Sequence, residues 1–342
     1  MTNHNYKRLV LINLVLVFLV IAAGAFVRMT GSGMGCPDWP KCFGYLIPPT
    51  ERAQLEWKPQ HQYKEGQVII INESLRVVKK DFNSNDTFDE TQWAPYTKHD
   101  YSVFNVYHTW IEFINRLLGA LAGLATFGLL LASGLRLKQS KSLFMWSFLV
   151  VLGMGFQAWL GKTVVDSNLL PVKITIHMAM ALLIVAFLIV LWDRVQPEET
   201  SKNLQKRFVG LTFLALLLSL IQIAMGTQVR QFVDTQMHQW NLLQPEKWLL
   251  NSPLVFYIHR SFSLLILGVN GFLGWQLWKN KMHNPTLYWI IGCIGLEMIT
   301  GASMYYFDFP IASQPIHLVL AALLFATQFY ILLQQKPLKV RK

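Results

Sequence analysis

Eight blocks of apolar residues, each close to the length that crosses a lipid bilayer, dominate the sequence. A helix that spans ~30 Å of hydrocarbon needs about 20 such residues, and its backbone polar groups must be satisfied within the segment. Only 14% of the residues are charged, and the 53% that are hydrophobic gather in the blocks. The sequence therefore predicts an all-α integral membrane protein with eight transmembrane helices, at roughly 9–28, 108–135, 142–161, 171–193, 207–229, 253–278, 285–307 and 311–335.

The net charge of +11 is distributed as membrane topology requires. If the amino terminus is cytoplasmic, the segments on that side hold half of the 30 Lys and Arg residues, while the three short outer connections hold only Lys162, Lys173, Arg230 and Lys247. This asymmetry predicts a multi-pass protein of the cell inner (cytoplasmic) membrane with both termini cytoplasmic. It also argues against a nucleic-acid surface. A cleaved signal peptide at 1–28 is disfavoured, because no clear small-residue cleavage site follows.

A stiff loop, GSGMGCPDWPKC at residues 31–42, follows the first helix. It lies on the outer side in this topology, where thiols oxidise, so Cys36 and Cys42 are expected to form a disulfide. A structural bond is favoured over a redox-active or gating loop, and a metal site is disfavoured because no histidine is near. Cys293 falls in an apolar helix and is expected in the core.

The outer segment 30–107 is predicted to be an insertion in the first half of the chain. From residue 50 onward it is polar and mixed in charge. The stretch QVIIINESLRVV predicts a β-hairpin, and KKDFNSNDTFDE predicts a flexible linker. No catalytic motif is found in it.

A four-helix unit is written twice in the chain. FQAWLGKTVVDSNLLPVKITIH aligns with LEMITGASMYYFDFPIASQPIH, EFINR with FYIHR, and GAFVR with GTQVR. We expect two tandem four-helix bundles, at 1–195 and 207–342, joined by a cytoplasmic linker at 196–206. The matched positions are Gln157 with Glu297, Gly161 with Gly301, His177 with His317, Asn115 with His259, Arg116 with Arg260, Gly24 with Gly226, and Arg28 with Arg230.

Three histidines, His177, His259 and His317, fall within apolar helices. Each lies on the order of 8–10 Å below the outer boundary at ~1.5 Å rise per residue. Polar side chains in hydrocarbon are costly and indicate function. In the second copy, His259 and His317 can face each other as axial ligands of one heme iron. The alternative is hydrogen bonding between helices by isolated histidines. Zinc would need further ligands, which are not found.

Two arginines, Arg28 and Arg230, are expected to end the first and fifth helices at the outer surface. There they could pair with the two propionates of a heme. Snorkelling of the side chains toward lipid headgroups explains them equally well.

These features together resemble the heme A synthase family: the duplicated unit, the GCPDWPKC loop, E-x-x-x-R beginning at Glu112, and the HR and IH pairs that contain His259 and His317. The resemblance implies a heme b cofactor held by His259 and His317. It also implies a substrate heme, heme O, near His177 and Glu112, with oxidation of one ring methyl to a formyl group. Heme O synthase and oxidase assembly factors are the implied partners, within membrane lipid. The electron donor stays unknown and a homo-oligomer stays open.

The sequence departs from the family at Asn115, where the commoner pattern has histidine. His108 could replace the missing ligand, but it lies two turns earlier, about 10 Å away along the helix axis. The favoured reading is that His177 alone holds the iron and that the Asn115 side stays open.

Glu112 projects to the same side of its helix as Asn115. It is expected to act catalytically by moving a proton or holding charge beside the substrate methyl. The alternative is an ion pair with Arg116 or Arg28. We also expect the GSGMGCPDWPKC loop to fold over the first heme site, because its glycines permit close backbone approach.

Three functions are therefore weighed. Heme O oxidation is favoured because the two copies have unequal ligand sets. A diheme b-type membrane electron-transfer protein without substrate oxidation is the alternative. A transporter is disfavoured, because these repeats are parallel, whereas many transporters have inverted repeats.

Overall fold

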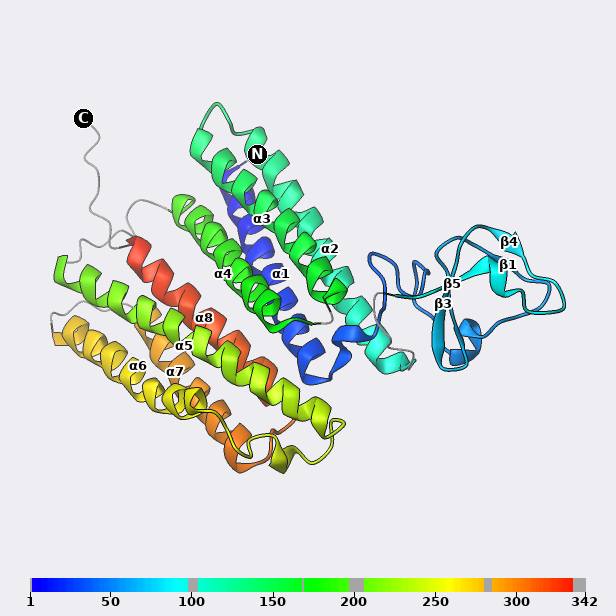
Figure 1. The fold of residues 1–342 in the computed structure, drawn as a ribbon. Coiled ribbons are helices and arrows are strands. Elements are labelled where there is room, and N and C mark those ends of the chain that lie inside the picture. Colours follow the sequence, from blue (N-terminus) through cyan, green and yellow to red (C-terminus); the bar gives the residue numbers. More distant parts are fainter. Residues whose placement is uncertain (1, 98–103, 168, 197–205, 280–284, 335–342) are drawn as a thin grey trace. The chain divides into compact units, whose positions relative to one another are not determined.

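The computed structural model describes residues 2–97, 104–167, 169–196, 206–279 and 285–334. Within these ranges, eight helices are long and apolar enough to cross a membrane (Figure 1). This confirms the predicted all-α membrane fold. The helices are α1 (Asn3–Met29), α2 (Val106–Gly134), α3 (Lys141–Asp166), α4 (Pro171–Arg194), α5 (Lys206–Gln239), α6 (Leu254–Lys279), α7 (Pro285–Tyr306) and α8 (Ser313–Gln334).

Some predicted positions fall outside the described residues. These are residues 197–205 of the linker, including Lys202, together with Lys281 and the basic carboxy-terminal positions Lys336, Lys339, Arg341 and Lys342.

Helix α5 is longer than predicted, since it continues from the expected end at residue 229 to Gln239. The added segment contains no proline or glycine. Its residues Val233 and Met237 are buried against Trp248, so the extension has its own small core. As a correction, Arg230 therefore lies inside α5 and not at its end.

The chain divides into two compact units, and their boundaries fall within helices. The larger unit contains Met1–Phe26, Leu121–Gln157 and Met178–Lys342. Within it, α5 packs on α6 and α8, and α7 packs on the same two helices, so α5 to α8 form a closed four-helix bundle. Its core includes Ile266, Ile290 and Leu320. Free Cys293 is buried in the same core, as predicted.

The smaller unit contains Val27–Ala120 and Ala158–His177. It holds the loop after α1, the insertion, and parts of α2, α3 and α4. Because the first four helices are shared between the two units, the bundle predicted at 1–195 stays a prediction.

The insertion is built from short strands. The predicted hairpin is confirmed: β2 (Val68–Ile71) and β3 (Ser74–Val78) pair in antiparallel register. They are joined through Asn72 and Glu73, and both have positive φ, as a two-residue type I′ turn requires. β5 (Trp93–Pro95) adds beside β3, and β1 (Gln62–Tyr63) pairs with β4 (Phe82–Asn83).

The predicted flexible linker, KKDFNSNDTFDE, is wrong, because this run is folded. Phe82 stacks on Tyr63 with ring centroids 5.5 Å apart, and Phe88 stacks on Trp93 at 5.9 Å. The low average hydropathy of the run concealed two aromatic side chains whose stacking partners, Tyr63 and Trp93, lie outside the run.

Candidate functional site

Two histidines meet inside the closed bundle of α5 to α8. The ring centroids of His259 on α6 and His317 on α8 lie 6.4 Å apart, and the ring planes cross at 70°. Since α6 and α8 are each flanked by α5 and α7, the two rings come together across the bundle. The expected facing arrangement is thus present in this bundle.

Side chains of α7 contact the His317 ring. Nδ1 of His317 lies 2.9 Å from Oε2 of Glu297 and 2.9 Å from Oγ1 of Thr300. On the other ring, Nδ1 of His259 is buried and has no hydrogen-bond partner among the described residues. The amide of Gln222 on α5 donates instead to the backbone carbonyl of His259, at 3.0 Å.

Glycines lie against both rings. A Cβ at Gly226 on α5 would stand 3.1 Å from Cε1 of His259, and one at Gly301 on α7 would stand 3.5 Å from Cε1 of His317. A larger side chain at Gly226 would therefore press on the His259 ring. Small residues at these two positions keep the space beside the imidazoles clear.

These residues fit axial ligation of one heme. Two imidazoles that bind one metal from opposite sides, with metal–nitrogen bonds of about 2.0 Å, need a ring separation close to the observed 6.4 Å. No group of three or more His, Cys, Asp or Glu suited to a metal ion occurs in the described part of the chain.

Arg230 joins α5 to α8 near the paired histidines. It makes an ion pair with Asp234 at 2.7 Å and donates to the side-chain oxygen of Gln314, three residues before His317. The guanidinium thus already has protein partners. Its predicted contact with a heme propionate, like that of Arg28, stays a prediction.

His177, the histidine of the first copy, also has its ring packed against a glycine. A Cβ at Gly161 on α3 would stand 3.5 Å from Cε1 of His177 on α4, as at Gly301 and His317. The sequence repeat is therefore reproduced in local packing. This match involves positions that the alignment paired from sequence alone.

On α2, the side-chain oxygen Oδ1 of Asn115 is buried and has no hydrogen-bond partner among the described residues. His108 lies near the beginning of the same helix, as the spacing requires. A buried amide oxygen without a partner among the described residues is costly.

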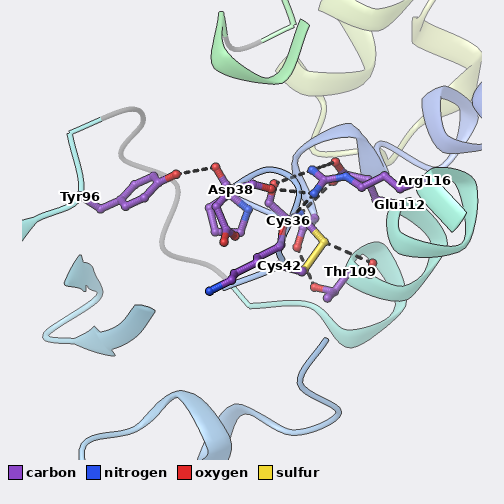
Figure 2. A network of polar contacts seen from close by, with 10 residues as sticks. Cys36, Asp38, Cys42, Tyr96, Thr109, Glu112 and Arg116 are labelled. Carbon is purple, nitrogen blue, oxygen red and sulfur yellow. Dashed lines mark hydrogen bonds and ion pairs between the residues drawn. A yellow bond between two sulfur atoms is a disulfide. The ribbon is translucent and has the colours of Figure 1, made fainter. Parts of the chain in front are cut away.

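Glu112 and Arg116 clamp the cysteine loop onto α2, as Figure 2 shows. Oε1 of Glu112 pairs with Arg116 at 2.5 Å, and Oε2 accepts the backbone N–H of Cys36 at 2.8 Å. The Glu112 side chain is 5% exposed. Arg116 also donates to the backbone carbonyls of Asp38 and Lys41, at 2.6 and 3.0 Å. Of the two alternatives for Glu112, the ion pair with Arg116 is present.

The loop itself is closed by the predicted disulfide between Cys36 and Cys42. Its backbone lies directly against α2, because a Cβ at Gly35 would stand 2.3 Å from the carbonyl oxygen of His108. The Thr109 hydroxyl donates to the Gly35 carbonyl at 2.8 Å. Only glycine allows so close an approach.

Two further contacts hold the loop. The Tyr96 hydroxyl, from the end of the insertion, donates to the Pro37 carbonyl at 2.6 Å (Figure 2). Asp38 accepts the N–H of Gly44 at 2.8 Å, and burial raises the pKa of the Asp38 carboxyl. Sequence reasoning missed Tyr96 and Thr109 as anchors. The i, i+4 spacing of Glu112 and Arg116 was the available signal for the clamp.

A family model described as cytochrome oxidase assembly protein matches residues 7–85 and 71–329. The chain belongs to this family. The match includes the clamp, the cysteine loop and all three intramembrane histidines.

Relatives of this chain carry the name heme A synthase. The one from Wolbachia pipientis wMel is 26% identical over 349 residues, which cover 93% of this chain and 89% of the relative. The one from Ehrlichia canis (strain Jake) is 24% identical, and the match covers 95% of this chain and 91% of the relative. The one from Flavobacterium psychrophilum is 23% identical, and the match covers 93% of this chain and 94% of the relative. The similarity therefore extends over almost the whole of each chain.

Proposed function

We propose that this protein is a heme A synthase, which oxidises a ring methyl of heme O to a formyl group and yields heme A for terminal oxidase assembly. The observation that carries the proposal is the family match, which spans nearly all of the chain. The paired imidazoles of His259 and His317 support it, because they supply a heme-binding geometry inside a membrane bundle.

In the second copy, His259 and His317 would hold heme b, and Gly226 and Gly301 keep the space beside the two imidazoles clear. When bound, heme b supplies one-electron transfer between the substrate site and an external acceptor or donor. Arg230 lies within the same bundle and would orient a propionate while keeping its link to Gln314.

In the first copy, His177 binds the iron of heme O, and Arg28 pairs with a propionate. The buried oxygen of Asn115 leaves its side of the site available to water or another small ligand. With water as the source of the oxygen atom, oxidation of a methyl to a formyl group releases protons and electrons. The electrons then leave to the external acceptor, and this site must pass the protons away. Glu112 acts there as the proton- and charge-handling group, and its ion pair with Arg116 holds the carboxyl in place.

The proposed setting is the cell inner membrane, with both termini in the cytoplasm and the insertion on the opposite side. Heme O synthase would supply the substrate, and oxidase assembly factors would receive the product. Hydrophobic heme substrates favour such a handover within the membrane.

The test is heme extraction and chromatography after co-expression with a heme O source. Wild-type protein is expected to yield heme A together with a low-spin b-type spectrum. His259→Ala and His317→Ala are each expected to lose the b-type signal and the heme A output while the protein stays in the membrane.

The exposed His238 on α5 provides a control, because His238→Ala removes an imidazole from the same bundle without touching the pair. Heme b without any conversion of heme O would support a diheme electron-transfer protein instead. An unchanged spectrum in both ligand variants would contradict the ligand assignment.

A further inference from the structure

We propose that Glu297 is a positioning residue that orients the His317 imidazole for iron and sets the reduction potential of the heme bound by His259 and His317. This inference rests on the proposed function, because it concerns the same heme site. It assigns a role to a buried carboxyl that the sequence pattern leaves without one.

The hydrogen bonds around His317 determine which ring nitrogen carries the proton. The Thr300 hydroxyl lies 2.9 Å from the backbone carbonyl of Leu296 and 3.0 Å from that of Glu297, so its hydrogen is directed to its own helix. Its oxygen therefore faces Nδ1 of His317 as an acceptor. The Glu297 carboxylate is an acceptor as well. Two acceptors at Nδ1 require an N–H there, which leaves the lone pair of Nε2 free to bind a metal.

Glu297 and Thr300 lie three residues apart on α7, so they share one face of the helix toward α8. The Glu297 side chain is 16% exposed, so water competes little for its hydrogen bond to His317. A carboxylate that accepts the second N–H of a ligating histidine fixes the ring orientation and makes the ligand more basic. A more basic ligand stabilises ferric over ferrous iron, which lowers the reduction potential.

The two axial ligands are unequal in this respect. His317 has a charged acceptor at Nδ1, whereas Nδ1 of His259 has no partner among the described residues. The sequence adds a second asymmetry, because the position that matches Glu297 in the first copy is Gln157, which is uncharged. At this position, the copy assigned to the retained cofactor has a carboxylate, and the copy assigned to a substrate that must leave has an amide.

The experiment is a redox titration of the purified protein with its native heme, followed by b-type absorbance, with low-temperature EPR of the ferric form. Glu297→Gln keeps an acceptor oxygen but removes the charge. We expect it to retain a low-spin heme with a more positive midpoint potential. Glu297→Ala removes both and is expected to shift the midpoint further and to lose part of the six-coordinate signal.

Glu246→Gln is the matched control, because it removes an exposed carboxyl from the same half of the chain and is expected to titrate like wild type. Wild-type midpoints and EPR signals in both Glu297 variants would overturn the proposal. If Glu297→Gln keeps the wild-type midpoint potential while Glu297→Ala does not, the carboxylate charge does not set the potential, and that part of the proposal is overturned. His317→Ala tests the heme site of the proposed function separately from the role of Glu297. A low-spin heme that persists in this variant refutes the ligand assignment, whatever the Glu297 variants do.

Discussion

At the scale of single residues, the two copies of the repeat share a contact between a histidine ring and a glycine, but they differ at the position that holds a second histidine in one copy only. His177 and His317 each lie against a glycine of the preceding helix. The partner position holds His259 in one copy and Asn115 in the other. An amide is a poor iron ligand compared with imidazole. In the proposed function, this one difference would separate a site for a retained cofactor from a site for an exchanging substrate.

Changing Asn115→His is expected to convert the first site toward a six-coordinate, low-spin heme and to slow heme O oxidation, because a second imidazole occupies the open side. Asn115→Ala is expected to leave iron ligation nearly unchanged. Absorption and EPR spectra of substrate-loaded protein, with heme chromatography, measure both effects. If wild-type protein already has two bis-histidine hemes and His108→Ala removes one, then His108 is the ligand and the open-side interpretation is wrong.

At the scale of elements, the cysteine loop depends on its fit against α2. The disulfide fixes the loop's own shape, while Glu112, Arg116 and Thr109 attach it to the helix. Gly35 sits where the two backbones meet, with no room for a Cβ. The loop and the beginning of α2 therefore pack as one element of the smaller unit.

Gly35→Ala is expected to force the loop away from α2, because the added Cβ would overlap the His108 carbonyl. The loss of the loop's hydrogen bonds should cost about 1–3 kcal/mol. Faster labelling of Cys36 and Cys42 after mild reduction would measure it. Gly119→Ala, on the same helix with open space around it, serves as the control and should label like wild type. Equal labelling rates in the two variants would show that the close contact does not hold the loop.

At the scale of the whole molecule, the described residues contain eight helices that could cross a membrane. If all eight cross it, both termini lie on one side, and the proposed topology assigns that side to the cytoplasm from the charge pattern. The insertion and the connection between α2 and α3 should then lie on opposite sides.

Single exposed cysteines test this arrangement in a membrane-impermeant labelling experiment. Glu56→Cys in the insertion is expected to label in intact cells, whereas Gln139→Cys, just after α2, should label only after the membrane is permeabilised. Native Cys293 is buried, and the other two cysteines are bonded, so the background is low. Labelling with the opposite order would invert the proposed topology.

The sequence by itself determined the helices, because lipid requires each spanning segment to be apolar and to satisfy its own backbone. These are local properties that one stretch of chain displays. The same reasoning located the three histidines within their helices. The repeat also aligned His177 with His317 and Gly161 with Gly301, and these two pairs of positions make the same contact in the structure. The short β2–β3 hairpin was also local, since its turn and its β-branched strand residues are adjacent in sequence.

Only the tertiary structure decided which side chains meet. The 6.4 Å approach of His259 and His317 depends on how α6 and α8 are rotated within the bundle. The acceptor pair at His317 comes from a different helix, and the loop clamp joins residues 76 positions apart. The aromatic core of the insertion likewise joins distant residues. Such contacts depend on packing between elements, and hydropathy carries no information about the rotation of one helix against another.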